Sequence, residues 1–151
     1  MKEIKKIFTE ELSKFGFKLK KDWYFKNEEL IIVVNLQKSN YSDIYFFNVG
    51  IWINQISTEF EFPKENKCHI RFRAERLFSE IPNDLHPLVI LNFEEKLNDR
   101  LGKTRKFLSD YLCPSLNNFK SVENICEMYR NGQFSYGYIR KEVKEMCNNK
   151  D

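Results

Sequence analysis

The chain has 151 residues, of which 42% are hydrophobic and 15% are aromatic. That length suits one domain with one core, and that composition excludes an intrinsically disordered chain. The formal net charge of +3 permits an anionic partner, but it is weaker than the clustered excess typical of nucleic-acid binders. We therefore expect a single folded domain over residues 1–151.

The sequence predicts a cytoplasmic protein without a membrane segment. Residues 1–7 mix charged and apolar side chains and lack the apolar core of a signal peptide. The longest purely apolar run, residues 30–34, is far shorter than a membrane span. The four cysteines lie far apart with no Cys-x-x-Cys pair, so we expect them to be reduced, buried apolar residues.

The first 26 residues predict a helix followed by a short hairpin arm. Apolar residues recur at helical spacing as far as Phe15, and Gly16 suits the left-handed conformation that ends many helices. Aromatic residues then alternate with lysines over residues 17–26. Bases of single-stranded nucleic acid stack on such rings, but we favour the simpler interpretation that the rings are core and the lysines face water.

Residues 30–60 are the most informative part of the sequence. They carry only three charges, at Lys38, Asp43 and Glu59. Two apolar runs, residues 30–36 and 44–53, flank a polar turn, and this pattern predicts a β-hairpin. Successive side chains of a strand point to opposite faces, and in both strands most of the side chains on each face are apolar. Other parts of the chain must therefore cover both faces of the hairpin.

Polar residues interrupt one face of this hairpin. Alternation places Asn35 and Gln37 on one face of the first strand, and Asn48 and Gly50 on one face of the second. These four residues meet if the strands pair in the expected register. A glycine inside a strand often marks a bulge or a close approach by another group, so we expect one of these at Gly50.

The clearest strand pattern follows in residues 68–75. Apolar side chains alternate there with His69, Arg71 and Arg73, which we expect to form an outward-facing row. Two guanidinium groups in a row suit a phosphate or a carboxylate, and the nearby amides would orient it. The predicted binding site comprises Asn35, Gln37, Asn48, His69, Arg71 and Arg73. In the alternative interpretation the two arginines simply pair with neighbouring glutamates on a solvated surface.

The same row offers little for catalysis. The arginines beside His69 would lower its pKa and leave a neutral base, yet no matching nucleophile or catalytic motif accompanies it. A zinc site would have to join Cys68 and His69 to the distant His86 or Cys113, against the usual ligand spacing. We therefore expect no metal and no cofactor, and we favour a role without catalysis while leaving an enzyme open.

The C-terminal half predicts helices. Residues 81–91 contain two prolines and predict a loop that ends in a short strand at 88–91. We expect one helix from Asn92 to Pro114, a second between Ser121 and Gly132, and a third over residues 138–146. The fold class is therefore α+β, with an N-terminal helix, an antiparallel β-meander of four to five strands, and C-terminal helices on one face of the sheet.

Several short motifs resemble a known bacterial family. They are Gly16-Phe17, Leu36-Gln37-Lys38-Ser39, Asn48-Val49-Gly50-Ile51 and His69-Ile70-Arg71-Phe72-Arg73. Over about residues 4–130 the chain resembles the family called domain of unknown function 4304. The resemblance implies a small cytosolic α+β domain with no assigned activity and no catalytic residues. Residues 131–151 lie outside it, and we expect them to form a helical extension.

Composition and the lack of a catalytic motif favour a protein-binding module, for example an immunity-type protein that neutralises a toxin. One alternative is a nucleic-acid-binding accessory protein that uses the lysine–aromatic arm and the strand of Arg71 and Arg73. Another is an enzyme or binder that takes a small anionic ligand at the strand of His69, Arg71 and Arg73. A homodimer through the aromatic strand, residues 45–53, is a further alternative, because one helical layer covers only one face of a sheet. We expect no membrane partner.

Overall fold

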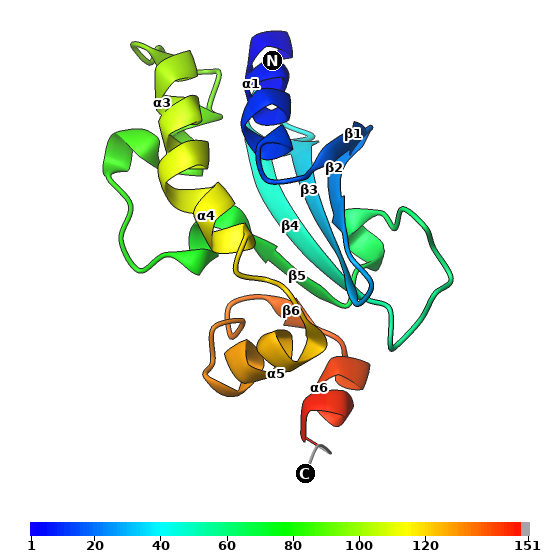
Figure 1. Ribbon diagram of the computed structural model, residues 1–151. Coiled ribbons are helices and arrows are strands. Elements are labelled where there is room, and N and C mark those ends of the chain that lie inside the picture. Colours follow the sequence, from blue (N-terminus) through cyan, green and yellow to red (C-terminus); the bar gives the residue numbers. More distant parts are fainter. Residues whose placement is uncertain (149–151) are drawn as a thin grey trace.

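Six strands form one sheet, in which each strand pairs antiparallel with the next one along the chain (Figure 1). The computed structural model describes residues 1–148. The strands are β1 Lys18–Lys20, β2 Asp22–Lys26, β3 Leu30–Lys38, β4 Tyr45–Ile53, β5 Ile70–Arg73 and β6 Tyr138–Ile139. The predicted α+β class is confirmed, with six strands instead of four to five.

The helices come before and after the main part of the sheet. They are α1 Lys2–Ser13, α2 Pro87–Ile90, α3 Arg100–Phe107, α4 Cys113–Leu116, α5 Val122–Arg130 and α6 Lys141–Asn148. Figure 1 shows α1, α3 and α4 together on one side of the sheet, while α5 and α6 lie near β6. Within residues 1–148, no helix is long and apolar enough to cross a membrane.

The first face of the sheet carries the main core. Alternate residues of β3 and β4 are fully buried there against the apolar stripe of α1. The ring of Phe8 lies 5.2 Å from the ring of Trp23 and 4.8 Å from that of Phe47, measured between centroids. This packing explains why α1 forms, because a short helix gains most of its stability from burying its apolar side.

The second face is covered at one end by the segment 54–69, which we call the cover segment. Tyr24, Ile31, Val33 and Trp52 of the sheet form a buried cluster there with Cys68 of this segment. The hydroxyl of Tyr24 donates to the carbonyl of Pro63 at 3.0 Å, and the indole N–H of Trp52 donates to the carbonyl of Ser57 at 2.9 Å. The second cover that an apolar hairpin requires is thus supplied by a segment with little regular structure.

Gly50 lets the cover segment approach the sheet. A Cβ atom at this position would lie 2.7 Å from the Sγ atom of Cys68 and 2.9 Å from its Cβ atom. Of the two alternatives for this glycine, the structure shows the close approach, and the approaching residue is Cys68.

The long helix differs from its prediction at both ends. It begins at Arg100, where the carboxylate of Asp99 accepts a hydrogen bond from the N–H of Gly102. Asn92 instead accepts a hydrogen bond from the N–H of Glu94 in a turn. Pro114 does not end the helix, because a π-helical stretch, Leu108–Leu112, comes just before it. That stretch breaks the regular hydrogen-bond pattern where proline lacks its N–H.

Two other predicted elements also change type. Residues 88–91 belong mostly to helix α2 and not to a strand, because Pro87 stands at its first position and His86 caps it. Tyr138–Ile139 forms strand β6 beside β5, so the last helix starts only at Lys141. By contrast, the predicted start at Ser121 and the stop at Gly132, with φ of 78°, are confirmed.

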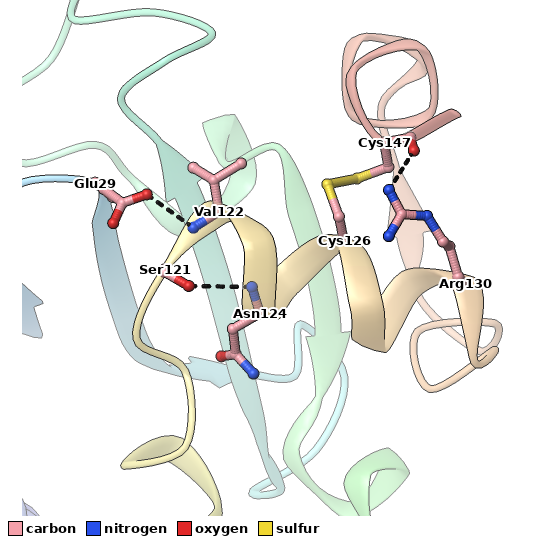
Figure 2. The surroundings of a disulfide bond; sticks show 7 residues. All are labelled: Glu29, Ser121, Val122, Asn124, Cys126, Arg130 and Cys147. Atoms are coloured by element: carbon pink, nitrogen blue, oxygen red, sulfur yellow. Dashed lines mark hydrogen bonds between the residues drawn. A yellow bond between two sulfur atoms is a disulfide. The ribbon is translucent and has the colours of Figure 1, made fainter. Parts of the chain in front are cut away.

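A disulfide joins the two C-terminal helices (Figure 2). Cys126 of α5 and Cys147 of α6 have Cα atoms 5.1 Å apart, and the guanidinium of Arg130 donates to the carbonyl of Cys147 at 2.7 Å. The expectation that all four cysteines are reduced is therefore wrong for this pair. Cys68 and Cys113 are buried free thiols, as expected.

We expect Gly50→Ala to lower the free energy of unfolding by about 1–3 kcal/mol, because the new methyl group overpacks the contact with Cys68. Urea denaturation measures this loss. Cys68→Gly provides the control through a double-mutant cycle: it should cost less in the Gly50→Ala background than in the native chain. An equal cost in both backgrounds would show that Cys68 is not what opposes a side chain at position 50.

We expect reduction of the Cys126–Cys147 disulfide to lower stability by about 3 kcal/mol, because the bond closes a loop across 21 positions. Thermal melts with and without a phosphine reductant measure the change. The doubly substituted Cys126→Ala/Cys147→Ala protein should melt at one temperature in both conditions. A shift of the same size in that variant would assign the effect to something other than the disulfide.

Candidate functional site

The second face of the sheet has a polar end next to the part under the cover segment. The five side chains there, which we call the amide–arginine patch, are Asn35, Gln37, Phe46, Asn48 and Arg73. In the observed register Asn35 lies opposite Asn48, Gln37 lies opposite Phe46, and Asn48 lies opposite Arg73. Four of the six predicted site residues therefore do meet on one face.

The three amides of the patch form a hydrogen-bonded chain. The side-chain NH2 group of Asn48 donates to the side-chain oxygens of Asn35 and Gln37, each at 3.0 Å. Asn35 in turn donates to the carboxylate of Asp22 at 3.0 Å. Asn48 is only 5% exposed, so its bonds are shielded from water and fix the orientation of its neighbours.

The guanidinium of Arg73 lies over the aromatic ring of this patch. Its guanidinium carbon is 4.0 Å from the centroid of the Phe46 ring, which favours a cation–π contact. Its Nη1 atom is shielded from solvent and has no hydrogen-bond acceptor among the described residues. Arg73 forms no ion pair with a described carboxylate, although Glu75 follows two positions later. The patch thus holds a cation without a partner.

Arg71 pairs with a glutamate, as the alternative interpretation held, but that glutamate is buried and does not lie on a solvated surface. Its Nε–H donates to the carboxylate of Glu65 in the cover segment at 3.0 Å, and its guanidinium carbon lies 5.8 Å from the ring of Tyr138. Of the two guanidinium groups that were predicted to be available to a ligand, the one from Arg71 is therefore already engaged. Arg71 ties the cover segment to β5, whereas Arg73 stays unpaired.

His69 does not belong to an exposed row. It is 1% exposed, and its ring centroid lies 4.3 Å from that of Trp52. Its Nδ1 atom accepts the backbone N–H of Ile53 at 2.9 Å, so the lone pair that a general base would use is already engaged. Burial, aided by the charge of Arg140, lowers the pKa of His69 to about 4. The expected exposed position of His69 in a row with the arginines is wrong, because its ring is buried against that of Trp52.

No pattern in the sequence indicates a second feature, a cleft of about 970 Å³ beside the C-terminal half. It is lined by residues from 75–79, 86–88, 115–119 and 124–136. Polar residues in loops without a periodic pattern supply much of its wall, so no spacing in the sequence marks them as neighbours. In the part of the chain that the structure describes, no three His, Cys, Asp or Glu side chains gather closely enough to hold a metal ion.

Comparison with family models now places the chain. The model described as Domain of unknown function (DUF4304) matches residues 8–118. The chain belongs to this family. All five patch residues of this DUF4304 domain lie inside the matched region, whereas both cysteines of the disulfide lie outside it. Neither the curated proteins nor the solved structures contain a match to the chain.

We expect acid to destabilise the domain through His69. Its pKa is below the usual 6.5 in the folded state, so folding favours the neutral ring. The stabilisation is complete above pH 6.5 and is lost as the pH falls toward 4, by up to about 1.4 kcal/mol per pH unit. Urea denaturation at pH 7 and pH 5 measures the loss.

The matched control for that experiment uses the other histidine. His69→Asn keeps an oxygen that accepts the N–H of Ile53 but does not titrate, so its stability should change less between the two pH values. His86→Asn, which keeps a capping acceptor for helix α2, should retain the pH dependence of the native chain. The assignment fails if both variants respond to pH as the native protein does.

Proposed function

We propose that this protein is a non-catalytic protein-binding module that docks its partner on the amide–arginine patch. The observation that carries the proposal is the half-buried Arg73, which lies on Phe46 with a solvent-shielded nitrogen and no acceptor within residues 1–148. A buried donor left unpaired costs about 1–3 kcal/mol. A partner that offers a carboxylate or carbonyl oxygen would recover this free energy once the guanidinium turns toward it.

The surrounding residues support a protein partner. Arginine and aromatic residues are enriched at the centres of protein interfaces, and the oriented amides supply hydrogen-bonding groups beside them. The patch lies on strands, which hold its side chains more rigidly than loops would. A toxin neutralised by an immunity-type complex is one such partner.

The other functions have weaker support from the geometry. Base stacking on the arm would need accessible rings, but Phe17, Trp23 and Tyr24 are all buried. A small anionic ligand would have to rely on Arg73 alone, because Arg71 is paired with Glu65. The apolar surface that suggested a homodimer is covered by the chain itself, through the contacts of Tyr24 and Trp52 with the cover segment.

We expect a tagged protein to capture one stoichiometric protein partner from a lysate of its own host, and Arg73→Ala to weaken the purified complex at least about tenfold. Titration calorimetry with the purified partner measures the change. Lys106→Ala on α3 removes the same charge far from the patch in sequence and should bind as the native chain does. Thermal melts check that both variants fold.

Three outcomes would count against the proposal. Equal loss of affinity in both variants would indicate charge attraction without a defined site. A partner indifferent to Arg73→Ala would place the interface elsewhere. Capture of nucleic acid in place of protein, visible in the ultraviolet absorbance ratio, would favour the accessory-protein alternative.

A further inference from the structure

The cleft beside the C-terminal half has no role in the proposed binding of a protein partner. Its volume is about 970 Å³, and an adjoining hollow of about 690 Å³ shares Glu75, Phe78, Ser79 and His86 with it. Volumes of this order suit a small molecule or a long side chain. The cleft is formed by different residues from the amide–arginine patch.

The charges around the two hollows are mainly negative. Three carboxylates line them, from Glu75, Glu80 and Glu127, against one guanidinium, from Arg76. The chain as a whole carries a net charge of +3, so this acidic lining is opposite in sign to the rest of the molecule. Such a lining attracts cations and repels anions.

Glu75 sits where the two hollows join and lacks a hydrogen-bond donor. Its Oε1 atom is shielded from solvent and has no partner in the described chain. A shielded carboxylate oxygen without a hydrogen-bond donor lowers the stability of the fold, because nothing compensates for the hydration that it has lost. Because Glu75 lines both hollows, an N–H donor from a bound ligand would satisfy this oxygen once the carboxylate turns toward the ligand.

Aromatic rings stand beside this carboxylate. Phe78 and Tyr111 both line the smaller hollow, and their ring centroids lie 5.7 Å apart in an edge-to-face arrangement. The faces of such rings attract cations, and their carbon atoms pack against the hydrocarbon part of an amine. A carboxylate next to aromatic walls is thus a chemical match for an alkyl amine or an alkyl guanidine.

We propose that this cleft binds a cationic ligand whose amine or guanidinium group donates a hydrogen bond to Glu75 and whose alkyl chain lies against Phe78 and Tyr111. The cation comes either from a free small molecule or from an arginine side chain of a peptide. The site works independently of the amide–arginine patch.

Titration calorimetry with agmatine, which carries both groups, is the test. We expect saturable binding of one agmatine per native chain and no binding of glutarate, a dianion of similar length. Glu75→Gln should weaken agmatine binding at least about tenfold, because the charge is lost at the contact. The same variant should melt no lower than the native protein without ligand, because it removes an unpaired buried carboxylate.

Helix α5 provides a matched pair of controls. Glu127 and Glu123 are both exposed on this helix, but only Glu127 is among the residues that line the cleft. Glu127→Gln should weaken agmatine binding, and Glu123→Gln should not. This pair keeps the test decisive even if Glu75→Gln fails to fold.

A blocked glycine–arginine–glycine peptide distinguishes the two sources of the cation. Binding of agmatine alone would assign a small-molecule site, and binding of the peptide alone or of both would assign recognition of an arginine side chain. The proposal is overturned if neither probe saturates, or if Glu127→Gln and Glu123→Gln weaken binding equally. Arg73→Ala should leave agmatine binding unchanged whether or not the patch binds a protein.

Discussion

The structure depends on the pairing of β3 with β4. These strands pair over nine residues each, from Leu30 opposite Ile53 to Lys38 opposite Tyr45, and most of their side chains are apolar on both faces. A sheet of this kind gains stability only if both faces are removed from water. Helix α1 and the C-terminal helices cover one face, and the cover segment covers part of the other. Most other elements owe their position to this requirement.

The amide–arginine patch lies at the polar end of that second face. Under the cover segment the sheet is apolar and tightly packed, with Gly50 against Cys68. Two residues from Gly50 along β4, Asn48 lies opposite Arg73 and the face becomes polar. Its amides are hydrogen-bonded, but Nη1 of Arg73 has no acceptor among the residues that the structure describes. A local departure from complete hydrogen bonding inside an otherwise consistent fold is typical of a functional surface.

The sequence predicted the features that strand alternation controls. Alternation put Asn35 and Gln37 on one face of their strand and Asn48 on one face of the next, but whether the three meet depended on a register that the sequence does not show. Alternation could not predict the burial of His69. It separates the two faces of a strand but does not reveal that the cover segment, of which His69 is the last residue, packs onto one of them. Nor could alternation predict that Arg71 forms an ion pair with Glu65 while Arg73 forms none with a described carboxylate. Which arginine is paired depends on the path of the cover segment, which carries Glu65. The disulfide and the cleft could not be predicted either, because each brings together residues whose spacing in the sequence follows no recognisable pattern.

The two borders of the sheet explain how so apolar a hairpin avoids pairing with other chains. An unpaired outer strand is a template on which another chain can add. Here the first strand, β1, has three residues, all exposed, and two of them are lysines. The opposite border is closed by β6, two residues drawn from the C-terminal segment, and next to them the N–H of Arg140 donates to the carbonyl of His69. Because β6 lies outside the region matched by the family, relatives that lack this segment must protect the outer side of β5 in another way.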